Sequence, residues 1–419
     1  MQERRSSFSW PSTWVVLVLA AAAPSCGSGT VLEGDADGGG ESVPVIPPID
    51  AADAADAVGW RDSTEPWLPP DDRECDNAVG WLSADLRTEA EGVYLLVRWV
   101  SGLHDPAPNS LSVQLNDGSG WREILHADCG VEGTACPARL AGSLDGRLVG
   151  WSPESIESEG RARGRFTCLD SPPRVCWPDV SGLYQVFVVS PDTAYAFRHE
   201  ELGPEVIELL DGTWSVLPPL LPTHEFNAMW ADAEGNVLLA TEDGLVVARS
   251  GDEWTTMDVG SLDPLSAIWS FGPDDIWVGT AAGGIRHFDG ESWQELAWPS
   301  LATGGVDPGE DPCDNLGAVG GFWGADGVLF FFTANQIVKW QDGTFEVLGH
   351  WPGTRSDEGL YGRCIGAMRP VAMWGKSPEE VFIVAVEPTV RDSDWRERDD
   401  CYEHAMWTLW WDGEHLRWF

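Results

Sequence analysis

The chain has 419 residues, of which 43% are hydrophobic, so it is long and apolar enough to bury the core of one large domain or two ordinary ones. Its 68 Asp and Glu residues outnumber its 25 Lys and Arg residues, which gives a formal net charge of −43 at pH 7. This charge repels phosphate backbones and anionic headgroups, and no cluster of Lys or Arg reverses the sign locally, so the composition argues against nucleic-acid binding.

Residues 1–25 have the pattern of an export signal peptide. Arg4 and Arg5 precede an apolar run at 14–23, and small residues follow that run. A run of about ten apolar residues is too short to span a hydrocarbon core of about 30 Å, so it is typical of a cleaved signal. We therefore expect this segment to be absent from the mature protein.

Cys26 comes just after the apolar run, in a pattern that resembles the lipobox of bacterial lipoproteins. The resemblance implies that Cys26 is the site of lipid attachment and becomes the new N-terminus. The alternative is an ordinary secretory signal cut near Ala23, which would leave Cys26 as an incidental thiol. Both interpretations predict an exported chain. The first also predicts lipid anchoring in the bacterial envelope, at the outer membrane.

Residues 26–74 have the composition of an acidic tether. They include few bulky apolar side chains and carry 12 acidic residues against Arg61 and Arg73. Such a stretch cannot bury enough surface to offset the entropy of ordering it, and its like charges keep it extended. Asp35 and Asp37 lack the later ligands of a calcium-binding EF-hand loop, so we predict no metal site here.

From about residue 78 to the C-terminus, the sequence repeats a unit of four short β-type runs separated by Gly, Pro and Asp turns. The unit is clearest at 267–296, which includes Ile276-Trp-Val-Gly-Thr280 and Asp289-Gly-Glu-Ser-Trp293. Runs of this length between turn residues are typical of a four-stranded antiparallel meander. Each unit is therefore predicted to form one sheet.

One large residue in the first strand of each unit marks the period of the repeat. These markers are Trp81, Leu140, Phe187, Trp230, Trp269, Trp323 and Trp374. Intervals of 39 to 59 residues with four strands per unit are the signature of a β-propeller. We predict an all-β propeller over residues 75–419 with seven four-stranded antiparallel blades. Because the Leu140 unit has no clear fourth strand, six or eight blades remain open.

At its Asp-Gly-x-Trp and Trp-Val-Gly elements, the chain resembles the tryptophan-rich β-propeller lipoproteins of bacterial envelopes and, more distantly, BNR/Asp-box and two-component-regulator propellers. The segment 289–293 departs from the Asp-box pattern, since no Ser begins it and no residue separates Asp from Gly. The resemblance therefore implies a fold and not an activity. We expect Asp289-Gly290 to turn the chain between strands three and four, and Trp293 to pack on the neighbouring blade.

The long segments between predicted strands fall on one face of the predicted ring. Links between blades and links from strand two to strand three open on this face, whereas the other links open on the opposite face. Long irregular loops in a compact domain commonly serve function, so this face is the predicted binding face. The long segments are 126–137, 164–182, 297–319, 349–370 and 386–404. Candidate ligand-binding residues there are Trp298, Asp311, Asp314, Trp351, Arg391 and Trp395.

Eight cysteines besides Cys26 form an even number in an exported chain, which argues for disulfide bonds that brace the same face. Zinc binding is the competing interpretation, but no C-x-x-C or H-x-x-x-H spacing occurs. We predict two local bridges and two bridges between distant loops: Cys129 with Cys136, Cys168 with Cys176, Cys313 with Cys364, and Cys75 with Cys401.

No catalytic motif is found, because the eight His residues are scattered and no G-x-S-x-G, H-E-x-x-H or phosphate-binding Gly loop occurs. We predict no cofactor and no metal. The leading hypothesis is a monomeric, envelope-anchored propeller that captures a protein or polysaccharide on the disulfide-braced face and meets the membrane only through its lipid. The alternatives are an envelope assembly scaffold and a glycoside hydrolase or polysaccharide lyase using loop carboxylates such as Asp311 and Asp314.

Overall fold

The computed structural model describes residues 79–418 with internal gaps, and all described residues belong to the compact unit Asp50–Phe419. The predicted signal peptide and tether, with Cys26, therefore lie outside the described residues. Within the described part, no helix has the length and apolar character needed to cross a membrane. The longer gaps are 102–108, 130–135, 152–165, 219–224, 299–316, 357–362 and 387–405.

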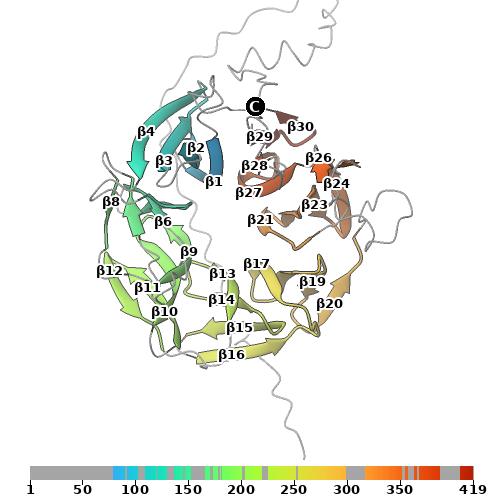
Figure 1. The fold of residues 1–419 in the computed structure, drawn as a ribbon. Helices are drawn as coiled ribbons and strands as arrows, with labels where there is room; N and C mark the ends of the chain where they lie inside the picture. The colour runs from blue at the N-terminus through green and yellow to red at the C-terminus, as the bar shows by residue number, and fades with distance from the viewer. Residues whose placement is uncertain are drawn as a thin grey trace, which may run out of the picture. The chain divides into compact units, whose positions relative to one another are not determined.

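Seven four-stranded antiparallel sheets follow one another along the chain and stand in a ring as the blades of a β-propeller (Figure 1). Blade 1 contains β1 (Val79–Glu89), β2 (Gly92–Ser101), β3 (Asn109–Asn116) and β4 (Trp121–Cys129), and blade 2 contains β5 (Arg139–Leu144), β6 (Arg147–Trp151), β7 (Phe166–Cys168) and β8 (Arg174–Val175). Blade 3 contains β9 (Leu183–Ser190), β10 (Thr193–Glu200), β11 (Gly203–Leu210) and β12 (Thr213–Val216). Blade 4 contains β13 (Phe226–Ala231), β14 (Val237–Thr241), β15 (Leu245–Ser250) and β16 (Glu253–Asp258).

Blades 5 to 7 contain β17 (Leu265–Gly272), β18 (Asp275–Thr280), β19 (Ile285–Phe288), β20 (Trp293–Leu296); β21 (Gly321–Ala325), β22 (Val328–Phe332), β23 (Gln336–Gln341), β24 (Thr344–His350); and β27 (Arg369–Ser377), β28 (Glu380–Val386), β29 (Met406–Trp411), β30 (Leu416–Trp418). The pair β25 (Thr354–Ser356) and β26 (Arg363–Ile365) forms a separate hairpin between blades 6 and 7. The prediction of seven blades is confirmed, and every predicted marker residue lies on the first strand of its blade.

Blade 2 is the least regular blade, and here one prediction from the sequence is wrong. The segment 164–182 does not link two blades, because it contains β7 and β8, which are strands three and four of blade 2. These strands have only three and two residues and flank Ser171-Pro172-Pro173, so no alternating pattern is long enough to reveal them. The long link of this blade is instead 152–165, between β6 and β7.

The two faces of the ring differ in the length of their links. We call the face that carries the strand-two-to-three and blade-to-blade links the loop face, and the opposite one the turn face. The segments 297–319 and 349–370 connect blades, and 386–404 connects β28 to β29, all as predicted. On the turn face, the link from strand one to strand two has two residues in every blade except blade 4, where it spans 232–236. The elaboration of the loop face is therefore confirmed, with 152–165 in place of 164–182. The predicted segment 126–137 is reduced to the link 130–138, because β4 continues to Cys129.

Asp-Gly pairs form the turns between strands three and four in two ways. At Asp211-Gly212 and Asp342-Gly343, both residues have positive φ, near 50° for Asp and 73° or 78° for Gly, which suits a two-residue hairpin between twisted strands. At Asp289-Gly290, Gly has φ 88° and the Asp289 carboxylate accepts the N–H groups of Glu291 and Ser292 at 3.0 and 2.8 Å. The predicted turn and its glycine geometry are therefore confirmed.

Each seam between neighbouring blades contains its own apolar cluster. A tryptophan from strand four closes several of these clusters by packing on the preceding blade: Trp214 does so in blade 3, Trp254 in blade 4 and Trp293 in blade 5. Trp254 also donates its indole N–H to the carbonyl of Pro218, 2.9 Å away in the link that follows blade 3. The predicted packing role of Trp293 is confirmed, and these rings join the sheets to one another.

Trp277 of β18 lies fully buried at the seam between blades 5 and 6. Its ring is stacked on His287 with centroids 4.1 Å apart and lies 4.6 Å from the ring of Trp340. Its indole N–H donates to Asp275 Oδ1 at 2.7 Å, and the same oxygen lies 2.8 Å from His287 Nε2. One carboxylate thus fixes both rings of the stack, while Trp340 supplies the contact from the next blade.

Replacing Trp277 by Ala should lower the free energy of unfolding by about 3–5 kcal/mol, because a fully buried aromatic ring leaves a cavity. The matched control is Leu262→Ala, at a side chain that is 100% exposed, for which we expect a change within about 0.5 kcal/mol. Urea unfolding of the two variants and the wild type measures the difference. Equal losses for both variants would contradict the packing role of Trp277.

Asp412 caps the turn between strands three and four of blade 7, and this makes the turn sensitive to acid. Partial burial alone would raise the pKa of Asp412, but the N–H groups of His415 and Glu414 and the charge of Arg417 outweigh it and hold the pKa below its usual value of 3.8. A carboxyl with a lowered folded-state pKa stabilises the fold above the unfolded pKa and loses that effect as pH falls through the folded one.

We therefore expect the wild type to be more stable than Asp412→Ala at pH 6, with the difference shrinking as the pH falls below 3.8. Thermal unfolding from pH 6 to pH 2 measures it. Glu414→Ala is the control, because it removes the same charge from an 85% exposed side chain in the same turn. A difference between wild type and Asp412→Ala that does not change with pH would refute the capping role.

Blade 1 and blade 7 close the ring without exchanging a strand, since β1–β4 and β27–β30 are each continuous in sequence. Thr88 donates its hydroxyl to the carbonyl of Gly375 at 2.9 Å, and the guanidinium of Arg87 lies 3.7 Å from the centroid of the Trp374 ring. Apolar side chains of both blades, including Leu95 and Phe382, form a common cluster behind these contacts. Among the described residues, side chains therefore hold the two ends of the propeller together.

Candidate functional site

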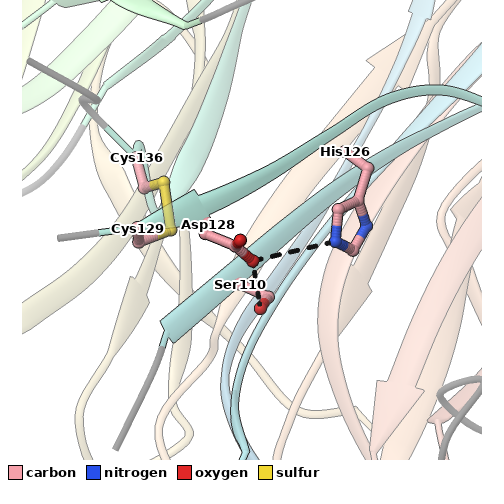
Figure 2. The surroundings of a disulfide bond; sticks show 5 residues. All are labelled: Ser110, His126, Asp128, Cys129 and Cys136. Carbon is pink, nitrogen blue, oxygen red and sulfur yellow. Dashed lines mark hydrogen bonds and ion pairs between the residues drawn. A yellow bond between two sulfur atoms is a disulfide. The ribbon is translucent and has the colours of Figure 1, made fainter. Parts of the chain in front are cut away.

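The two local disulfides predicted from the sequence are present, but they lie on different faces. Cys129–Cys136 joins the end of β4 to the link toward blade 2 and braces the loop face (Figure 2). Cys168–Cys176 spans the turn between β7 and β8 and braces the turn face. The expectation that all bridges share one face is therefore wrong, because the sequence analysis took 164–182 for a link between blades and did not recognise β7 and β8 within it. Cys75, Cys313 and Cys401 lie outside the described residues, as does the side chain of Cys364.

A polar ladder runs beside Cys129 across β3 and β4 of blade 1. Ser110 donates its hydroxyl to Asp128 Oδ1 at 3.4 Å, and the same oxygen lies 4.0 Å from His126 Nε2 (Figure 2). On the other side of the imidazole, Nδ1 lies 3.5 Å from Glu123 Oε2, which accepts the hydroxyl of Ser112 at 2.6 Å. Each serine thus donates to a carboxylate, whereas a serine nucleophile must donate to the imidazole. The ladder is a hydrogen-bonded network that lacks the serine-to-imidazole hydrogen bond of a catalytic triad.

The third strand of blade 1 also carries a row of buried polar side chains. Ser110, Ser112, Gln114 and Asn116 alternate along β3 and are all buried. In other blades the third strand offers apolar side chains to its neighbour, such as Val338 of β23 in the seam between blades 5 and 6. The ladder therefore joins β3 to β4 within blade 1, while the described contacts between blades 1 and 7 are the apolar cluster, the Thr88–Gly375 hydrogen bond and the Arg87–Trp374 contact.

Two of the six predicted ligand-binding residues are described, and both pack into the domain on the loop face. Trp298 follows β20, donates its indole N–H to the carbonyl of Gly283 at 3.1 Å and meets Phe331 edge-on, with centroids 5.3 Å apart. Trp351 follows β24, and its backbone N–H donates to the carbonyl of Asn335 at 2.9 Å. The indole of Trp298 thus bonds to the turn between strands two and three of its own blade. Trp351 bonds to the corresponding turn through its backbone, and its ring packs in the seam with blade 7, with its centroid 6.5 Å from that of Trp418. The other four candidates, Asp311, Asp314, Arg391 and Trp395, lie outside the described residues.

The turn beneath Trp351 contains polar side chains that the sequence analysis did not single out. Thr333, Asn335 and Gln336 are 1%, 3% and 0% exposed. Thr333 Oγ1, Asn335 Oδ1 and both amide atoms of Gln336 are buried and have no hydrogen-bond partner in the described structure. A buried polar atom without a partner costs about 1–3 kcal/mol, so within the described structure this turn lowers the stability of blade 6.

The repeat itself shows how this turn of blade 6 differs. Thr241 and Thr280 end strand two of blades 4 and 5, and each hydroxyl accepts the N–H of the residue four positions on, Leu245 and Gly284 respectively, at 2.9 Å. Thr333 follows strand two of blade 6, where a shorter turn bonds its own N–H to the carbonyl of Gln336 at 3.0 Å. The shorter turn leaves the Thr333 hydroxyl unused. Comparing the three Thr positions in the aligned repeats could have revealed this difference from the sequence.

A cavity of about 400 Å³ lies among the first strands of the seven blades. Blades 1 to 5 line it with Asp85, Arg87, Arg139, Gln185, Asn227 and Ser266 as well as apolar groups. Blades 6 and 7 line it with glycines and apolar side chains, among them Phe322, Phe332, Met373 and Trp374. The cavity therefore has one polar side and one apolar side, which is a common design for a small-molecule site.

The polar side of the cavity is held in place by bonds between blades. Asp85 Oδ2 accepts the N–H of Leu140 in blade 2 at 2.8 Å, while its Oδ1 accepts the N–H of Leu86 at 2.9 Å. Arg87 donates Nε–H to the carbonyl of Leu140 at 3.3 Å, and Arg139 donates in the reverse direction to the carbonyl of Ala84 at 3.4 Å. These crossed bonds make the first strands of blades 1 and 2 a rigid wall.

The electrostatics of this wall are unusual for so acidic a chain. Enclosure lowers the pKa of the Arg87 guanidinium; Asp85 and Glu89 oppose the shift, and the nearby charge of Arg139 adds to it. The two arginines are therefore close enough to repel one another. Neither forms an ion pair within 4.0 Å among the described residues. In the same part of the chain, no group of three His, Cys, Asp or Glu side chains is arranged to hold a metal ion.

The ring of seven four-stranded sheets defines the chain as a β-propeller. No protein-family model and no curated protein matches its sequence. YCF48 from Cyanidioschyzon merolae is 11% identical over 74% of this chain and 96% of that chain, with a TM-score of 0.43. A structure of YCF48 bound to D1 peptide is 13% identical over 78% and 99%, with a TM-score of 0.41. The Swd1 propeller of Myceliophteria thermophila is 14% identical over 73% and 95%, also at 0.41. Likeness this distant has no bearing on function.

Proposed function

We propose that this chain is an exported propeller, anchored in the bacterial envelope by a lipid on Cys26, that captures a partner protein on its loop face. The observation that carries the proposal is the asymmetry of the ring. Every link longer than nine residues lies on the loop face, while the strand-one-to-two links of the turn face are reduced to two residues in six blades. A rigid scaffold with one elaborated face is a common design for recognition.

The charge of the chain favours a protein partner over an acidic polysaccharide. The net charge of −43 repels polyanions and attracts a basic surface. The same binding would serve an envelope assembly scaffold, whose partner would be an envelope protein.

The loop face can be tested by shortening it at blade 7. Val386 of β28 pairs with Met406 of β29, so an Asn-Gly turn can replace residues 387–405 without breaking the ladder. The matched control inserts five Gly and Ser residues between Asp211 and Gly212 on the turn face. We expect the full chain and the control to retain equal amounts of an envelope protein after cross-linking. The shortened variant should retain at least about tenfold less of that protein.

The outcomes of this experiment separate the classes of function. A glycan array on the same three proteins tests the polysaccharide alternative, and release of reducing sugar from envelope polysaccharide tests the hydrolase alternative. A partner kept by the shortened variant but lost by the turn-face insertion would overturn the assignment of the loop face. Binding of glycans with no protein partner would overturn the choice of a protein.

Anchoring at Cys26 is tested separately with Cys26→Ser in the full chain. We expect the wild type to partition into the detergent phase of a Triton X-114 separation and to gain the mass of a diacylglycerol, because stable anchoring needs more than one acyl chain. The variant should move to the aqueous phase. The control is Cys136→Ser, which removes a thiol of the Cys129–Cys136 bridge and should stay in the detergent phase. A wild type found in the aqueous phase would refute the anchor.

A further inference from the structure

We propose that the central cavity binds a small organic anion, whose charged group is held by Arg87 and Arg139 and whose apolar body lies against blades 6 and 7. This inference goes beyond capture of a protein on the loop face, because the site, the residues and the class of ligand are all different. It rests on the volume of the cavity, the charge of its wall and the hydrogen-bond donors that its arginines leave unused.

The size and shape of the cavity suit a small molecule. Its volume of about 400 Å³ falls within the range of roughly 300–1,000 Å³ that is usual for ligand sites. Phe332 and Trp374 offer aromatic rings on one side, and Gln185 offers a carboxamide on the other. A ligand with an aromatic or aliphatic body and one polar end can therefore meet both sides at once.

The wall of the cavity brings two arginines together although the chain as a whole is strongly anionic. The charged side chains among its described lining residues are Arg87, Arg139 and Asp85, and Glu89 also acts on Arg87 from outside the lining, in a chain of net charge −43. Both carboxylate oxygens of Asp85 already accept backbone N–H groups. A ligand with a single negative charge can therefore pair with the arginines, whereas a polyanion would be repelled by the net negative charge of the chain.

The two guanidinium groups have donors to spare. A guanidinium carries five N–H donors, yet Arg87 uses only Nε–H and Arg139 only one Nη1–H in hydrogen bonds to described residues. The terminal nitrogens of Arg87 and Arg139 are not among the fully buried atoms without a partner, so they are accessible from the cavity. Carboxylate, sulfonate and phosphate oxygens are the acceptors that match this fork of donors.

The arginine that would lose most freedom on binding is already fixed. Arg87 is stacked on the Trp374 ring and bonded to the carbonyl of Leu140. The ring of Phe332 is also confined, since it packs on Gly320 so closely that an added Cβ there would clash with it. A site whose groups are ordered before binding loses little entropy when the ligand enters.

The proposal is tested with a pair of fluorescent probes that share one scaffold. The anionic probe is 1-anilinonaphthalene-8-sulfonate and the neutral probe is N-phenyl-1-naphthylamine, which lacks the sulfonate. We expect the full-length wild type to bind the anionic probe at least about tenfold more tightly than the neutral one. Equal affinities, or preference for the neutral probe, would overturn the proposal.

Four variants locate the binding. Arg139→Gln should lower the affinity for the anionic probe at least about tenfold and change the affinity for the neutral probe by no more than about twofold. Arg139→Lys should restore part of the lost affinity. Arg122→Gln is the matched control, because it removes the same charge from an outer strand of blade 1, where the side chain is 56% exposed, and it should change neither affinity. Gln185→Trp fills the cavity without breaking a hydrogen bond to a described residue and should weaken both probes.

Unchanged binding of the anionic probe in both Arg139→Gln and Gln185→Trp would place the probe outside the cavity and overturn the proposal. So would an equal loss in Arg122→Gln and Arg139→Gln. Melting curves show which variants fold. If Arg139→Gln does not fold, Gln185→Trp still tests whether the probe binds in the cavity. Arg139 begins β5 and Gln185 lies near the start of β9, so both follow loop-face links, but the probes measure small-molecule binding and the shortened loop measures capture of a protein. Failure of one test therefore leaves the result of the other to stand by itself.

Discussion

Closure of the ring between blades 1 and 7 is the contact on which the whole propeller depends. In the described structure no strand crosses this seam, so the two ends of the domain are joined by Arg87 on Trp374, by Thr88 on the carbonyl of Gly375, and by the apolar cluster behind them. Arg87 reaches blade 2 as well, through the carbonyl of Leu140. One side chain therefore connects three blades and also faces the central cavity, which ties the shape of that cavity to the closure of the ring.

The rest of the ring is a repetition of one packing rule. Aromatic side chains of strand four close the seam toward the preceding blade, and buried rings such as Trp277 extend the contact toward the next. This explains why so many of the 25 tryptophans belong to the framework. It also explains why Trp298 and Trp351, which lie outside the strands, are drawn into the same packing on the loop face.

The period of the repeat was enough to predict the architecture, because four strands, a marker residue and an Asp-Gly turn recur at each blade. The Asp289-Gly290 turn and the role of Trp293 follow from local chemistry, so they were also predictable. Local sequence failed at β7 and β8, where two very short strands beside two prolines resemble a loop, and this placed Cys168–Cys176 on the wrong face.

The cavity could not be predicted for a different reason. Arg87, Arg139 and Trp374 are far apart in sequence, and nothing in their local surroundings shows that three first strands bring them together. The same holds for the alternating polar residues of β3, which resemble the exposed side of a strand but are buried. Tertiary contacts, and not local pattern, decide the chemistry at the axis and along β3.

The continuity of each blade in sequence has a consequence for how such a chain can change over time. Because each described sheet is complete within one stretch of 30 to 51 residues, duplication or deletion of one stretch adds or removes an entire sheet and leaves no strand without its neighbours. Only the fit of side chains where the first and last sheets meet then limits the number of sheets. In propellers that share a strand between their ends, the same event must also preserve that shared strand.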